Sequence, residues 1–154
     1  MAEIKKNSTF VSKPVPIFPS YRPMLRIGQN LLVLKLNSYG NKASLLKLHL
    51  FSWGFKELNN LSAIQSFAAS NSQERIRFFG IEPTLNRALS FAIYDGLIDL
   101  KKGVYVLTSK GNFLADKILD DNELFIIEKP ILKAIGKNPT ETSLLQLQKF
   151  WKNA

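Results

Sequence analysis

The sequence predicts a mainly α-helical protein of the α+β class with one small β-hairpin. Two short apolar runs, LIDL and VYVLT, flank Lys101, Lys102 and Gly103, and this arrangement is typical of two strands joined by a tight turn. A helix with periodic apolar residues precedes the hairpin, and another helix follows it. Helices closed by such a hairpin form a winged helix-turn-helix, which is therefore the expected fold.

Further helices are expected on both sides of this unit, because apolar residues recur there at helical spacing. The expected helices cover residues 26–39, 42–57, 61–70, 82–96, 109–119, 123–135 and 141–151, with strands at 75–80, 97–100 and 104–108. Thr108 or Ser109 is the expected N-cap of the helix after the hairpin. The core-facing stripe of helix 82–96 is expected to be Leu85, Ala88, Leu89 and Ala92.

Three regions follow from this organisation. Residues 1–23 hold four of the seven prolines, and because proline fixes φ and lacks a donor, we expect an extended or irregular N-terminal arm. Residues 24–121 form the expected winged-helix domain. Residues 122–154 form the expected C-terminal helical extension.

The net charge of +9 is unevenly distributed along the chain. Residues 1–56 hold nine basic residues and one acid, whereas residues 57–154 hold twelve basic residues and eleven acids. A basic surface favours nucleic acid, an acidic protein partner or an anionic membrane as the partner. The alternative reading is that spaced lysines serve solubility alone.

Composition excludes several classes of protein. The chain has no cysteine, which removes disulfides, thiol catalysis and cysteine-ligated metals. It has no apolar run of membrane-span or signal-peptide length, so a cytoplasmic protein with no membrane partner is expected. The single histidine, His49, lies in an apolar helix, and glycines occur singly. We therefore expect no catalytic site, metal, cofactor or small-molecule substrate.

Contacts to DNA require basic and amide side chains, which match phosphates and base edges. The candidate DNA or phosphate contacts are Lys35, Lys42, Lys47, Asn86, Arg87, Lys101, Lys102 and Lys110. Helix 82–96 also carries Glu82 and Asp95, so its net charge is −1. We therefore expect sequence-independent phosphate contact more than base reading, with much of it from the basic N-terminal third.

Helix 42–57 carries more large apolar residues than one helix face can hide. Such a helix is either buried on several sides or part of an interface with another protein. The candidate partner contacts are Phe51, Trp53 and Phe55 of this helix, with Phe18 and Tyr21 of the proline-rich arm.

Three stretches together resemble a known family. They are ASLLKLHLFSWGF (43–55), RIRFFGIEPTLNRALSFAIYDGLIDL (75–100) and GVYVLTSKGNFLADKIL (103–119). Roughly residues 20–137 resemble the middle component of bacterial ABC three-component systems, the small winged-helix-like proteins of Lamassu-type anti-phage defence, encoded beside an SMC/Rad50-like ATPase. The resemblance implies a non-catalytic accessory subunit that bridges this ATPase to an effector protein, to double-stranded DNA, or to both.

Two alternatives to this reading stay open. One is a stand-alone winged-helix transcription regulator that dimerises through helices 123–151. The other is a small effector or toxin-type component with no role on DNA. The negative net charge of helix 82–96 argues against the first of these, because an operator-reading helix is usually basic.

Overall fold

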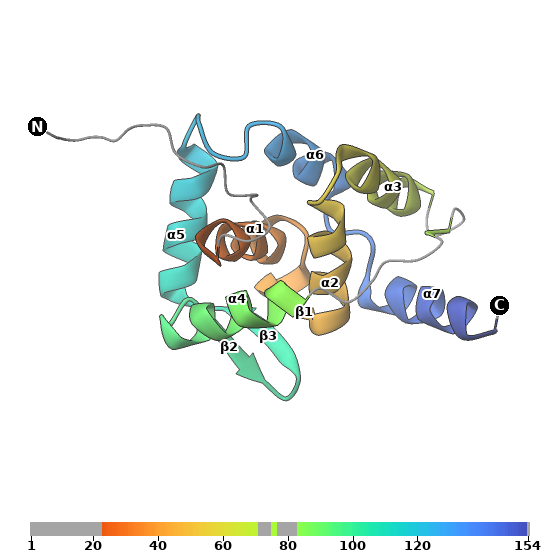
Figure 1. Cartoon of the computed structure of the whole chain (residues 1–154), viewed down its shortest axis with the longest axis horizontal. Helices are drawn as coiled ribbons and strands as arrows, with labels where there is room; N and C mark the ends of the chain where they lie inside the picture. Colours follow the sequence, from red (N-terminus) through yellow and green to blue (C-terminus); the bar gives the residue numbers. More distant parts are fainter. Residues whose placement is uncertain (1–22, 71–74, 77–82, 154) are drawn as a thin grey trace, which may run out of the picture.

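The computed structural model describes residues 23–70, 75–76 and 83–153. These residues form an α+β fold of seven α-helices and a three-stranded antiparallel sheet (Figure 1). The elements are α1 (Pro23–Leu36), the 3₁₀ helix η2 (Tyr39–Asn41), β1 (Lys42–Ser44), α2 (Leu45–Gly54), α3 (Leu58–Ala69), α4 (Pro83–Tyr94), β2 (Ile98–Lys101), β3 (Val104–Leu107), α5 (Ser109–Asp120), α6 (Glu128–Ile135) and α7 (Glu141–Asn153). The predicted class, mainly α with a small sheet, is confirmed.

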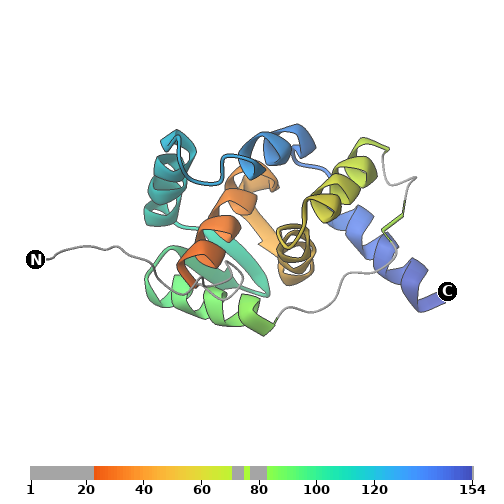
Figure 2. The same cartoon turned by 45° about the horizontal axis from the view of Figure 1, so that its top comes forward.

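Helix α1 is the centre of the core, with α2, α4, α5 and α6 packed around it (Figures 1 and 2). Every residue from 26 to 34 is buried. A helix enclosed on all sides must also satisfy its buried polar groups. The Arg26 guanidinium donates to Ser52 Oγ of α2 at 2.7 Å, and the Asn30 amide donates to Arg26 O at 2.9 Å.

The sheet differs from the predicted hairpin by one additional strand. Its order is β1-β3-β2, and both pairs are antiparallel. The prediction of helix from residue 42 onward is wrong for residues 42–44, which form β1 and pair with residues 104–106. The two paired segments are far apart in sequence, and local periodicity carries no information about such a pairing.

Alternation of side chains gives the sheet an inner and an outer face. The inner face contributes Ala43, Ile98 and Leu107 to the core. The outer face carries two rows of directly opposed residues, Lys42–Val106–Asp99 and Ser44–Val104–Lys101. The outer face therefore carries polar and charged residues at both edges, with two valines between them.

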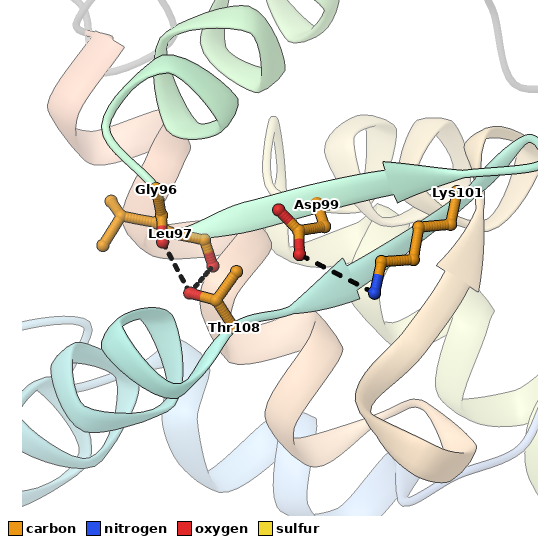
Figure 3. A network of polar contacts seen from close by, with 5 residues as sticks. All are labelled: Gly96, Leu97, Asp99, Lys101 and Thr108. Carbon is orange, nitrogen blue, oxygen red and sulfur yellow. Dashed lines mark hydrogen bonds and ion pairs between the residues drawn. The ribbon is translucent and has the colours of Figure 1, made fainter.

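A tight turn forms the tip of the β2–β3 hairpin, and side-chain hydrogen bonds of Thr108 join the two strands at its base. At its tip, Lys102 and Gly103 have positive φ angles of 53° and 80°, which is the signature of a two-residue type I′ turn. At its base, the Thr108 hydroxyl lies 2.6 Å from Gly96 O and 3.1 Å from Leu97 O (Figure 3). Thr108 is also the N-cap of α5, as predicted, because its Oγ accepts from Gly111 N at 3.0 Å.

The two final helices pack on the same core as the rest of the chain. Leu132 of α6 and Leu144 of α7 belong to the buried cluster that includes α1. The fully buried Asn37, just after α1, donates its amide to Leu132 O at 2.9 Å and to Gly136 O at 2.6 Å. Leu132 O also accepts from Gly136 N at 3.1 Å, so the Asn37 amide adds a second donor there and ties the end of α1 to the end of α6.

The remaining predictions agree with the structure in most elements. The stripe of α4 is confirmed, since Leu85, Ala88, Leu89 and Ala92 are its buried residues. Residues 123–127 were expected in a helix but precede α6. The strand expected at residues 75–80 and the arm 1–23 lie almost entirely outside the described residues. Within the described ranges, no helix is long and apolar enough to cross a membrane.

Candidate functional site

A depression of about 650 Å³ lies on the outer face of the sheet. Its floor is formed by Val104 and Val106 of β3, and its walls come from η2, β1, the first turn of α2 and the start of α7. We call it the sheet pocket; it is lined by Tyr39, Lys42, Ala43, Ser44, Lys47, Lys101, Lys102, Val104, Val106, Thr140 and Glu141. Four lysines and one glutamate therefore surround an otherwise largely apolar space.

Three of these lysines are exposed at the rim of the pocket. Lys42 comes from β1, whereas Lys101 and Lys102 come from the hairpin tip, and β3 joins the two strands into one sheet. The only ion pair among them within the described residues is the one between Lys101 Nζ and Asp99 at 4.0 Å, which is long and exposed (Figure 3). The pairing of β1 with β3 thus gathers into one site two groups of lysines that the sequence separates.

The fourth lysine, Lys47, is buried. Its side chain lines the pocket, yet only 2% of the residue is exposed. Its ammonium makes no hydrogen bond or ion pair with the described part of the chain. Burial lowers the pKa of Lys47 from 10.5 to about 8, and the charge of Glu141 opposes this shift only in part.

Glu141 holds the start of α7 against the start of α2. Its carboxylate accepts from Ser44 N at 3.0 Å and from Ser44 Oγ at 2.5 Å. Ser44 is the N-cap of α2, where its Oγ accepts from Lys47 N at 3.2 Å. The negative charge of Glu141 is thus engaged with Ser44 and does not form a direct ion pair with Lys47.

The other predicted DNA contacts lie away from the sheet pocket. Lys35 is engaged inside the molecule, with Asp116 at 3.2 Å and Asn112 Oδ1 at 2.6 Å. Lys110 donates to Asp95 O at 2.8 Å. Asn86 and Arg87 are exposed on the outer side of α4. Of the eight candidates, four line the pocket and four do not.

The basic excess of residues 1–56 does not form a continuous surface in the described part of that segment. Arg26 and Lys47 are buried, and Lys35 is paired with Asp116. Lys42 and Lys56 remain exposed there. Four basic residues of the segment, Lys5, Lys6, Lys13 and Arg22, lie outside the described residues, so the expectation that this region supplies most of the phosphate contact stays a prediction.

The predicted partner contacts of α2 are mostly part of the core. Phe51 is 1% exposed and belongs to the core cluster, so no surface of it is available to a partner. Trp53 and Phe55 are half-buried against the same cluster. His49 is buried, as expected for a histidine of the core. The two arm residues, Phe18 and Tyr21, lie outside the described residues.

Comparison with family models, curated proteins and solved structures gives no match. The function must therefore be argued from the chemistry of the site. Among the residues that the structure describes, no group of three or more His, Asp or Glu side chains is placed to hold a metal ion.

Sequence reasoning missed three participants in the site: Tyr39, Ser44 and Glu141. The local sequence TET around Glu141 predicts a helix cap. It does not predict that the Glu141 carboxylate accepts hydrogen bonds from Ser44. No local signal links it to residue 44, because the contact spans most of the chain. Ser44 itself could have been found, since a serine directly before the first residue of a helix is a common N-cap.

Proposed function

We propose that the protein is a winged-helix, non-catalytic accessory subunit of an SMC-like ATPase defence complex, and that it holds the backbone of double-stranded DNA against the outer face of its sheet. The observation that carries the DNA contact is the gathering of Lys42, Lys101 and Lys102 around one depression. The ATPase, the effector and the cytoplasmic setting rest on the family resemblance of residues 20–137.

The connectivity supports a winged helix. Helices α1, α2 and α4 pack together, and the β2–β3 hairpin follows α4 directly. The strand before α2 adds to the hairpin and gives the order β1-β3-β2. The hairpin tip, with Lys101 and Lys102, is the wing in this assignment.

The chemistry of the rim favours phosphate over bases. A lysine ammonium is a compact point charge on a flexible stem, which suits phosphate oxygens but does not discriminate between base edges. The two opposing carboxylates nearby are Asp99, at the hairpin, and Glu141, which is held by Ser44. Binding of this kind is independent of sequence and sensitive to salt.

The DNA contact is tested by removing the rim charges. The triple variant Lys42→Ala/Lys101→Ala/Lys102→Ala is expected to weaken binding to duplexes of unrelated sequence, measured by fluorescence anisotropy. Each phosphate contact contributes about 0.9 to the slope of log K against log salt concentration, so the slope should become shallower by up to roughly 2.7. All duplexes should lose affinity to the same extent.

The matched control removes three exposed lysines elsewhere, as Lys133→Ala/Lys149→Ala/Lys152→Ala. This variant has the same net charge as the first and should bind DNA nearly as the wild type does. If both variants lose affinity and slope equally, the effect belongs to net charge, and the proposed site is wrong.

The accessory role is tested separately. Co-expression with an SMC-like ATPase encoded beside this gene is expected to give a complex that co-elutes on size exclusion. A neighbouring gene set without such an ATPase, or separate elution of the two proteins, would contradict the role. Either result leaves the DNA measurement above unaffected.

One observation favours the alternative of a stand-alone regulator. The outer side of α4 exposes Asn86, Arg87 and Ser90, which are residue types that read base edges. In that case Asn86→Ala/Arg87→Ala would abolish the preference for one selected duplex and leave binding to unrelated duplexes unchanged. The accessory-subunit proposal expects no such preferred duplex.

A further inference from the structure

We propose that the sheet pocket is a binding site for a phosphate group carried by a small organic molecule, with the buried Lys47 ammonium as its principal charged ligand. The site goes beyond the proposed function, because contact with a DNA backbone requires only the exposed rim lysines. It also departs from the expectation that the protein binds no small molecule.

The first argument is the position of Lys47. An ammonium that is removed from water and has no partner is unfavourable, and such groups are normally paired. Lys47 is 2% exposed and lines the pocket, no described residue forms a hydrogen bond or ion pair with its ammonium, and its neighbouring opposite charge is that of Glu141. A phosphate oxygen in the pocket would supply the missing partner.

The second argument is that the local backbone makes the unpartnered charge still less favourable. Lys47 lies in the first turn of α2, three residues after the Ser44 cap. The N-terminal end of a helix carries partial positive charge, so a cation there is disfavoured and an anion is favoured. Ser44 and Glu141 already occupy the cap, and the residue that lines the adjacent pocket from this turn is Lys47.

The third argument is the charge around the pocket. Lys42, Lys47, Lys101 and Lys102 contribute four positive charges against the one negative charge of Glu141. Glu141 would repel an anion, but its two oxygens are held by Ser44 N and Ser44 Oγ. A dianionic phosphate monoester therefore meets a net positive site with one recessed and three rim cations.

The fourth argument is size and lining. A volume of about 650 Å³ is larger than a phosphate ion needs and lies in the range of small-molecule sites. Val104 and Val106 give the pocket an apolar surface, and the exposed Tyr39 ring stands at its edge. These residues suit the organic part of the ligand, and Lys137 Nζ, which lies over the Tyr39 ring at 5.5 Å from its centroid, adds a further positive charge at this edge.

Titration calorimetry of the full chain with inorganic phosphate and with a mononucleotide tests the site. The wild type is expected to bind one phosphate group per chain. Lys47→Met, which keeps the shape of the side chain without its charge, is expected to lower the affinity by roughly 10- to 150-fold, because a charge-assisted hydrogen bond is lost. Lys56→Met, at an exposed position outside the pocket, should bind as the wild type does. Absence of saturable binding to the wild type, or equal binding by Lys47→Met, overturns the proposal.

The pH dependence separates Lys47 from the other groups that face it, which are Tyr39, Lys42, Lys101, Lys102 and Glu141. Sulfate is the probe, because it stays dianionic throughout. Burial lowers the pKa of Lys47 to about 8, so above this pH the affinity of the wild type should fall by up to about tenfold per pH unit. Lys47→Arg stays charged and should show no such fall, while the other facing groups are the same in both proteins. Identical pH profiles would assign the binding to the rim and overturn the role of Lys47.

A phosphate group could come from a free molecule or from DNA, and competition distinguishes the two. If a mononucleotide displaces duplex DNA from the wild type, the pocket takes a backbone or terminal phosphate of the duplex. If both bind together, the ligand is a separate small molecule. Phosphate binding by Lys47→Met and DNA binding by the rim triple variant are measured independently. Failure of the DNA proposal therefore does not affect the test of the sheet pocket, and failure of the pocket proposal does not affect the test of DNA binding.

Discussion

Lys47→Met is expected to raise the free energy of unfolding by about 3 kcal/mol at pH 7. Burial lowers the pKa of Lys47 from 10.5 to about 8. This difference corresponds to about 3 kcal/mol, by which the charged ammonium destabilises the folded state at pH 7. Methionine has a similar shape, fills the same space and carries no charge. A more stable variant that loses ligand binding would show that stability is sacrificed for function at this position.

The sign of the pH effect follows from the two pKa values. Between about pH 8 and 10.5 the unfolded chain holds the Lys47 proton and the folded chain does not, so the stability of the wild type rises with pH over this interval. Urea unfolding at pH 7 and near pH 10 should therefore show the gap between Lys47→Met and the wild type closing as pH rises. Lys42→Met, at an exposed position, should stay within about 0.5 kcal/mol of the wild type. A destabilised Lys47→Met, or a gap that does not change with pH, contradicts the burial argument.

Gly111→Ala is expected to destabilise the fold by about 3 kcal/mol or more. Gly111 lies in the first turn of α5, where an added Cβ would stand 2.0 Å from Leu97 O and 2.9 Å from Leu107 Cδ1. The closer neighbour is backbone at the base of the hairpin, so it can move only if α5 separates from the sheet. Thermal unfolding should show a large fall in Tm or loss of folded protein.

The control is a second helical glycine with a neighbour that can move. In Gly28→Ala the added Cβ would lie 3.2 Å from the ring of Phe125. Alanine favours the helix by about 1 kcal/mol over glycine, which offsets a small displacement of that ring. Its stability should therefore stay within about 1 kcal/mol of the wild type. Equal losses for the two glycines would mean that the contact with Leu97 is not the cause.

The elements that the sequence predicts well are those fixed by local pattern. The buried stripe of α4 follows from helical spacing, and the turn at Lys102 and Gly103 follows from turn chemistry. Thr108 likewise caps α5 because a threonine before a helix is a strong local signal. None of these depends on which other part of the chain lies nearby.

The candidate site was predicted only in part, because it depends on contacts between distant segments. Lys42 and the hairpin lysines were named separately, but their common position requires the pairing of β1 with β3. Lysine is normally exposed, so nothing in the local pattern distinguishes the buried Lys47 from the exposed Lys42. The same limit applies to Phe51, which local pattern could not place inside the core rather than on a surface.

The walls of the sheet pocket come from three parts of the chain, around residues 39–47, 101–106 and 140–141. None of these parts can form the pocket alone, and during synthesis the last of them emerges after the other two. A ligand that requires all three therefore binds the fully folded state and no partly folded one. Its occupancy should slow amide hydrogen exchange in β1 and at the start of α7 together, as one cooperative unit.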